Sequence, residues 1–197
     1  MCPPTKGKPL ESLKTDRLSL MLDQLDRARE MCETRLTGLT DDEYLWEPAP
    51  GAWSIHRRKD ATSPKPYGPG EWVIDDASED PDPAPVTTIA WRLGHLHWSF
   101  AGRWEWTFGE RKQSPKVLVD FAPTAALGQE RFWALMDRWR ESIATLTEEQ
   151  LDTTGFGQFP NGSDPDWPFA SVLWWTNLEF VHHAAEMGLL RDLYRAQ

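Results

Sequence analysis

The feature of the sequence that most restricts its fold is a set of four long stretches in which apolar residues recur every three or four positions. The stretches lie at about residues 16–38, 87–108, 124–146 and 169–194. This spacing gathers apolar side chains on one face of an α-helix, and that face must be buried against another element. The pattern therefore predicts an all-α fold, a four-helix bundle, in a single domain that spans residues 1–197.

The segments between these stretches predict how the helices begin and how they are connected. Thr40–Glu43 and Thr147–Gln150 both have the spacing of a capping box, which satisfies free N–H groups at a helix start. Residues 56–86 contain six prolines, which exclude a continuous helix and predict an irregular insertion with one short strand at Trp72–Ile74. Residues 1–14 are expected to form a flexible tail. The long connections permit a crossed topology.

Composition excludes several classes of partner. The formal net charge is -10 and the pI is about 4.9, so the chain repels nucleic-acid phosphates and anionic membrane surfaces. The only cysteines are Cys2 and Cys32, and no disulfide framework is expected from them. No apolar run reaches the roughly 20 residues that cross a bilayer, and the first residues lack the apolar core of a signal peptide. These observations predict a cytoplasmic protein that binds neither nucleic acid nor membrane.

The last stretch carries polar side chains on a face that is otherwise apolar. Glu179 and His183 are four residues apart, so a helix presents their oxygen and nitrogen atoms side by side. Burying a carboxylate or an unpaired imidazole costs several kcal/mol unless a hydrogen bond, an opposite charge or a metal ion compensates for it. Together with His95 in the second stretch, these residues are candidate metal ligands. On spacing alone, an ordinary hydrogen-bonded pair is the simpler interpretation of Glu179 and His183.

The last stretch also has a second line of apolar residues beside the first. It consists of Trp174, Leu178, Val181, Ala185 and Leu189. Two apolar lines on one helix predict that this helix is buried at the centre of the bundle.

Three segments of the chain resemble the landmarks of the DinB-like (DinB/YfiT) superfamily of metal-binding four-helix-bundle proteins. They are Trp53–Ile55, Leu93–Leu96 and Glu179–Glu186, and the resemblance covers most of the chain. It implies one metal ligand from a histidine of the second helix, which His95 matches. It implies two more from a His-x-x-x-His pair of the fourth helix, and His183 matches the second of these. Glu179 stands where the first histidine of that pair is usual, which is a departure from the family pattern.

The resemblance implies a single divalent metal ion in a site of two histidines and one carboxylate. Such a set suits zinc, nickel, iron or manganese. A second departure from the family is the long insertion at residues 56–86, where a short link is usual, and we expect this insertion to cover the mouth of the site.

The family implies two kinds of reaction. One is S-transfer or isomerisation with a low-molecular-weight thiol such as mycothiol or bacillithiol, and the other is metal-dependent hydrolysis. A small-molecule substrate and a second copy of the chain are the expected partners, since homodimers are common in the family. Two other interpretations stay open. The ion or a stored ligand belongs to a non-catalytic binding module, or the three side chains form a buried polar network without any ion.

Several neighbouring residues have competing interpretations. His182 and Glu186 are also four residues apart; we expect Glu186 to orient a ligand and His182 to be a core or outer partner of the site. His97 is rotated by about 200° from His95, which predicts a surface or interface position. His56 receives no role. Three aromatic residues flank the ligands and are expected to pack in the core, to line a pocket, or both: Trp91, Trp98 and Trp175.

Overall fold

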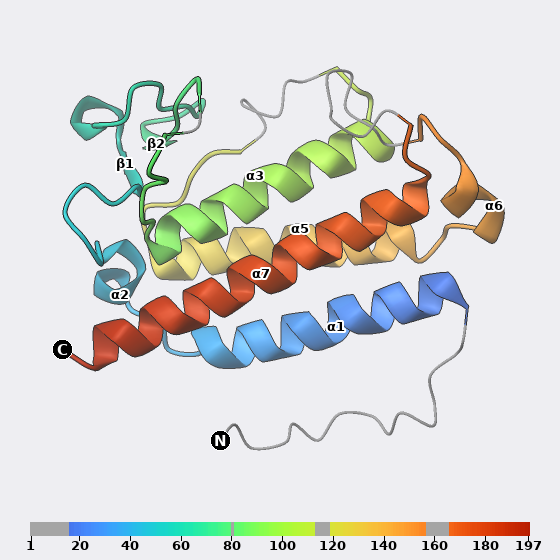
Figure 1. Cartoon of the computed structure of the whole chain (residues 1–197), viewed down its shortest axis with the longest axis horizontal. Coiled ribbons are helices and arrows are strands. Elements are labelled where there is room, and N and C mark those ends of the chain that lie inside the picture. Colours follow the sequence, from blue (N-terminus) through green and yellow to red (C-terminus); the bar gives the residue numbers. More distant parts are fainter. Residues whose placement is uncertain (1–15, 80, 113–118, 157–165) are drawn as a thin grey trace.

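The computed structural model describes residues 16–79, 81–112, 119–156 and 166–197, and it is mainly helical (Figure 1). The predicted tail at residues 1–14 lies outside the described residues. The long helices are α1 (Arg17–Leu36), α3 (Ile89–Thr107), α5 (Ala125–Ile143) and α7 (Phe169–Arg195), and the short ones are α2 (Asp41–Leu45) and α6 (Glu148–Asp152). Among these helices, none is long and apolar enough to span a membrane.

The four long helices pack along one another. Figure 1 shows α7 between α1 and α3, with α5 behind α7. Helix α7 packs against both α1 and α3, and α3 packs against α5. Following the colours in Figure 1, α1 and α7 run in one direction and α3 and α5 run in the other. The contact between α3 and α7 brings the two predicted ligand-bearing helices together.

Polar caps at the helix starts lie where the sequence predicts them. The side chain of Asp16 accepts a hydrogen bond from the Ser19 N–H at 2.9 Å, and this cap starts α1. Both predicted capping boxes are present, at Thr40 before α2 and at Thr147 before α6. Local hydrogen bonding therefore explains where these helices begin.

The insertion contains a small antiparallel hairpin that the sequence predicted only in part. Strand β2 (Trp72–Ile74) was expected, whereas its partner β1 (Ile55–Arg57) and the 3-10 turn η2 (Arg58–Asp60) were not. The hairpin packs on α3 at Gly94, where an added Cβ would lie 2.9 Å from the Ile55 side chain. A larger residue would push the hairpin away. The insertion is thus fixed to α3 at the residue next to His95.

The second apolar line of α7 is exposed, so the prediction that this helix is centrally buried was wrong. The core side of α7 is formed by residues such as Val172, Phe180 and Met187, which are buried. The other line faces outward, with exposed fractions of 53% for Trp174, 48% for Leu178, 39% for Val181 and 59% for Leu189. Periodicity identifies apolar faces but does not tell what covers them.

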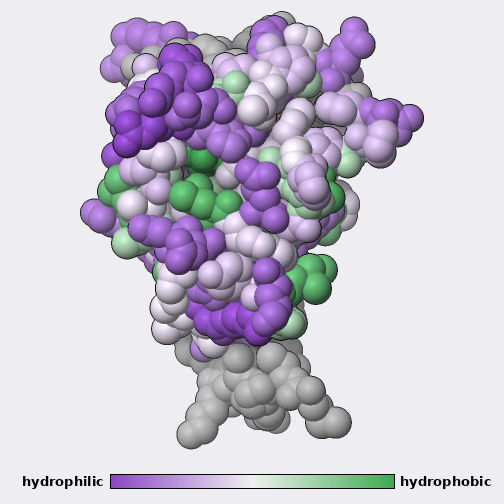
Figure 2. All heavy atoms as spheres, turned by 90° about the vertical axis from the view of Figure 1, so that its left-hand side faces the viewer, coloured by the Kyte–Doolittle hydropathy of each residue, from purple (hydrophilic) through white to green (hydrophobic). Residues whose placement is uncertain are grey.

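The C-terminal part of α7 is joined to α2 by a buried ion pair. Arg191 is 2% exposed and Glu43 is 4% exposed. The Arg191 guanidinium donates to both carboxylate oxygens of Glu43, at 3.0 and 3.2 Å, and Arg195 donates to the same carboxylate at 2.8 Å. Arg191 also donates to the Thr37 carbonyl at 2.9 Å. The end of the molecule that carries α2 and the hairpin is mostly hydrophilic (Figure 2).

Candidate metal site

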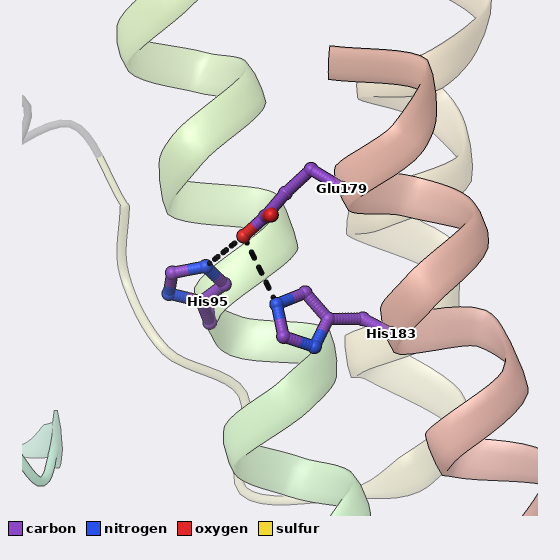
Figure 3. Close-up of side chains that lie close together, drawn as sticks. All are labelled: His95, Glu179 and His183. Carbon is purple, nitrogen blue, oxygen red and sulfur yellow. Dashed lines mark hydrogen bonds and ion pairs between the residues drawn. The ribbon is translucent and has the colours of Figure 1, made fainter. Parts of the chain in front are cut away.

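The three predicted ligands meet between α3 and α7. Figure 3 shows the Glu179 carboxylate between the imidazoles of His95 and His183. Glu179 Oε1 lies 3.0 Å from His95 Nε2 and 3.0 Å from His183 Nε2. One donor atom from each residue lies within 4.8 Å of the other two, which is close enough for one ion to contact all three. The i,i+4 spacing on α7 and the packing of α3 against α7 together produce this cluster.

The electrostatics of the cluster favour a charged carboxylate beside a neutral imidazole. Hydrogen bonds from His183 and His95 lower the pKa of Glu179, although burial acts in the opposite direction. Burial is the main cause that lowers the pKa of His95, while its hydrogen bond to Glu179 opposes this shift. A carboxylate and a neutral imidazole are the protonation states that bind metal.

The second nitrogen of His183 is held by a carboxylate. His183 Nδ1 lies 2.6 Å from Glu186 Oε2, and Arg92 Nη1 lies 3.1 Å from the same oxygen. Arg92 Nη1 also lies 3.1 Å from His183 Nδ1 itself. Because the guanidinium can only donate, Glu186 accepts from Arg92, and it accepts from His183 as well when Nδ1 carries the ring proton. Metal-binding histidines usually donate their other ring N–H to a carboxylate in this way, which fixes the tautomer and the ring orientation.

The donor set fits a divalent metal ion. Without an ion, hydrogen bonds from Nε2 to Glu179 and from Nδ1 to Glu186 would together need a proton on each nitrogen of the His183 ring. With an ion, the Nε2 lone pairs of both histidines and the Glu179 oxygen face the cation, and only Nδ1–H of His183 is needed for Glu186. Two imidazoles and one carboxylate are common ligands of zinc and of other transition metals.

Trp91 connects the site to the insertion. Its ring stacks on His95, with ring centroids 5.0 Å apart and an interplanar angle of 6°. Its indole N–H donates to the Asp75 carbonyl at 2.9 Å, directly after β2. The Asp75 side chain is fully buried and accepts from the Ser54 N–H and from His56, both at 2.9 Å. The insertion therefore supports the ring of His95 through Trp91.

No role for His56 was predicted from the sequence, and the structure places this residue in the support of His95. Its hydrogen bond to Asp75 raises the pKa of His56, although burial opposes the shift. Burial alone would raise the pKa of Asp75, but hydrogen bonds from His56 and from the Ser54 N–H outweigh it and lower that pKa. The pair joins β1 to the residue that follows β2.

The other predicted neighbours differ in how close they lie to the cluster. The ring of Trp98 is 6.0 Å from that of His95, between His95 and Tyr67. Trp175 is partly exposed, one helical turn before Glu179. His182 is exposed and is therefore not part of the core. Its Nε2 lies 3.1 Å from Oε1 of Glu186.

His97 faces away from His95, as predicted, but it is not a free surface residue. It is partly buried and lines a cavity of about 380 Å³ between α3 and α5 together with Trp104 and Arg138. Burial lowers the pKa of His97 to about 4. This imidazole therefore stays neutral near pH 7.

Arg92 is the neighbour of the site that the sequence analysis missed. It precedes His95 by three residues and therefore shares its helix face, which is the signal that identifies it. Its guanidinium lies over the Trp91 ring, 5.2 Å from the centroid, and its charge offsets that of Glu186. Arginine is not a metal ligand, so a search for ligands alone passes over it.

Comparison with known proteins supports the family resemblance of the sequence. The family model described as the DinB superfamily matches residues 64–187, which include α3, α5 and the ligand-bearing part of α7. Neither the curated proteins nor the solved structures gave a match. The match covers more than half of the chain, and we conclude that the chain belongs to the DinB superfamily.

Proposed function

We propose that this protein is a metal-dependent enzyme in which His95, Glu179 and His183 hold one divalent ion. The observation that carries the proposal is the position of one Glu179 oxygen 3.0 Å from Nε2 of both histidines. When bound, a divalent ion supplies Lewis acidity, which makes a water or a thiol a better nucleophile at neutral pH. Membership of the DinB superfamily supports the same function.

The chain's own residues have separate tasks in this proposal. Glu179 supplies the anionic ligand and His95 a neutral nitrogen, and Trp91 holds the plane of the His95 ring by stacking. Glu186 accepts the Nδ1 proton of His183, so Nε2 keeps its lone pair. Arg92 neutralises Glu186, and the Glu186 charge therefore adds little to the charge of the ligand set.

The accessibility of the cluster favours a reactive ion over a structural one. The side chain of His183 is 7% exposed, but those of His95 and Glu179 are 22% and 21% exposed. Structural zinc sites are closed by protein ligands, whereas catalytic sites keep a position open to water or substrate. Three protein ligands at a partly exposed position match the second kind. A non-catalytic module with a structural ion is the rival function.

Elemental analysis of protein purified without chelator tests metal binding. We expect one ion per chain in the wild type, none in His183→Ala, and one in the control His182→Ala. The control removes an adjacent, exposed imidazole of the same helix that contacts Glu186 Oε1 and stacks on the His183 ring but contributes no donor atom to the cluster. Equal metal content in all three proteins would refute the site.

Removing and restoring the metal then separates the enzyme from the rival. A catalytic ion leaves a folded apoprotein that regains activity when Zn²⁺, Ni²⁺, Fe²⁺ or Mn²⁺ is returned, whereas the loss of a structural ion unfolds the domain. Activity is followed as consumption of mycothiol or bacillithiol with an electrophile, and as hydrolysis of ester and amide substrates. Thiol consumption would assign an S-transferase or isomerase, and hydrolysis without thiol a hydrolase. The thiol reaction belongs to the cytoplasm, where such thiols stay reduced.

A further inference from the structure

A cavity of about 380 Å³ lies between α3 and α5, apart from the metal cluster. From α3 it is lined by His97, Ala101, Trp104 and Glu105, which share one face of the helix because they follow one another at intervals of three or four residues. This face is turned away from His95, since positions two apart on a helix differ by about 200°. His97 and Glu105 are eight positions apart, so the cavity extends about 12 Å along α3.

Small and apolar side chains form part of the wall of this cavity. Ala101 lines it from α3, and Ala134 and Leu135 line it from α5. The two alanines leave space that larger side chains would fill. Cavities of about 300–1,000 Å³ that combine apolar walls with a few polar groups are typical small-molecule sites in proteins. The volume here therefore suits a small ligand with an apolar part.

Two side chains of opposite charge also line the cavity, and they do not pair with each other. Glu105 comes from α3 and Arg138 from α5. Within the described part of the chain, neither of them forms an ion pair, whereas other arginines of the bundle such as Arg17 and Arg140 are paired with carboxylates. Glu105 Oε1 has the Lys112 backbone nitrogen at 3.4 Å. A cation and an anion beside one cavity are complementary to a ligand that carries both charges.

Local contacts hold both charged groups in place. The Trp104 indole N–H donates to the Ser142 hydroxyl at 2.9 Å, and the Arg138 guanidinium lies over the Trp104 ring, 3.1 Å from the centroid. The Glu105 carboxylate lies against Gly109, where an added Cβ would collide with Oε2. The glycine thus leaves room for the carboxylate. Groups that are fixed in advance lose less conformational entropy when a ligand binds.

We propose that this cavity binds a free amino acid with an apolar side chain. The Arg138 guanidinium donates to the carboxylate of the ligand, and the Glu105 carboxylate accepts from its ammonium group. The apolar side chain of the ligand packs against Leu135 and Ala101. A zwitterion uses both charged groups of the cavity, whereas a simple acid or amine leaves one of them without a partner. This inference is independent of the metal site.

Isothermal titration calorimetry of the full chain with L-leucine, L-phenylalanine and two analogues tests the proposal. The analogue 3-phenylpropionate lacks the ammonium group of L-phenylalanine, and phenethylamine lacks its carboxylate. We expect one amino acid per chain and at least about tenfold weaker binding of both analogues, because each leaves one charged group of the cavity unpaired. No binding of either amino acid at about 10 mM, or equal binding of L-phenylalanine and both analogues, would overturn the proposal.

Two variants assign the charges of the ligand to the two side chains. Arg138→Gln should weaken the binding of L-phenylalanine about tenfold or more and weaken that of 3-phenylpropionate, but not that of phenethylamine. Glu105→Gln should weaken L-phenylalanine by a similar factor and weaken phenethylamine, but not 3-phenylpropionate. Neither position is buried, so circular dichroism should show both variants folded, and their metal content should equal that of the wild type.

Arg140→Gln is the matched control. Arg140 lies on the same helix as Arg138, but it pairs with Asp26 and does not line the cavity. This variant should bind L-phenylalanine like the wild type. Wild-type affinity in both cavity variants, or an equal loss of affinity in Arg140→Gln, would place the ligand elsewhere and overturn the proposal.

Discussion

The buried pair of Glu43 and Arg191 gives the clearest stability prediction. Burial alone would raise the pKa of Glu43, but hydrogen bonds from Arg191, the Thr40 N–H and Arg195 outweigh it and lower the pKa from its ordinary 4.5 to about 2. A pKa lowered by this amount corresponds to about 3 kcal/mol of folding free energy at neutral pH, at 1.36 kcal/mol per tenfold change in proton affinity. Removing one partner of a buried ion pair costs a similar amount.

Glu43→Gln should therefore lower the free energy of unfolding by about 3 kcal/mol at pH 7, measured by urea titration. Because the pKa of Glu43 is lower in the folded protein, its contribution is complete above about pH 4.5 and disappears as the pH falls towards 2. The difference between wild type and variant should shrink over that range. The control Glu148→Gln removes an exposed partner of Arg17, and the unfolding midpoint should stay unchanged. A difference below about 1 kcal/mol for Glu43→Gln, or one that is independent of pH, would refute the reasoning.

Three further predictions concern the site and the core. Glu186→Gln should weaken Zn²⁺ binding about ten- to a hundredfold in calorimetric titration, because the amide is a weaker acceptor for the Nδ1 proton of the ligand; unchanged affinity would remove Glu186 from the site. Trp91→Phe keeps a stacked ring but loses the hydrogen bond from the indole N–H to the Asp75 carbonyl. We expect the unfolding free energy to fall by about 1 kcal/mol and the metal stoichiometry to be preserved. Loss of the metal would show that stacking alone does not hold His95 in place. Burial raises the pKa of the Cys32 thiol to about 12, so peptide mapping after brief alkylation should find it modified only in unfolded protein; rapid modification of folded protein would contradict its burial.

Local signals in the sequence were sufficient for most of the helices. Asp16 and Thr40 accept hydrogen bonds from N–H groups within three residues, so their role depends on nearby sequence only. Strand β1 has no such signal. Residues Ile55–Arg57 become a strand by pairing with Trp72–Ile74 across a Pro-rich segment, and a non-local pairing of this kind cannot be read from either segment alone.

The cluster of three candidate metal ligands was predictable because metal binding restricts both residue type and spacing. Glu179 and His183 lie on one face of one helix, and the family landmark at His95 supplied the distant partner. The residues that support the ligands were harder to predict from the sequence. Arg92 and Asp75 act through hydrogen bonds to other side chains or through the backbone, so their roles depend on how α3 packs against α7 and the hairpin. The outward line of α7 was misinterpreted because periodicity alone does not distinguish a buried apolar face from an exposed one.

The most direct test of the metal site is a crystal structure of metal-loaded protein with data collected at the absorption edge of the bound metal. We predict one anomalous peak per chain, bonded to Nε2 of His95, Nε2 of His183 and a carboxylate oxygen of Glu179 at about 2.0–2.2 Å. The hydrogen bond between His183 Nδ1 and Glu186 should be retained. A peak at His182 and Glu186 instead, or no peak between α3 and α7 in fully loaded protein, would contradict the proposed site.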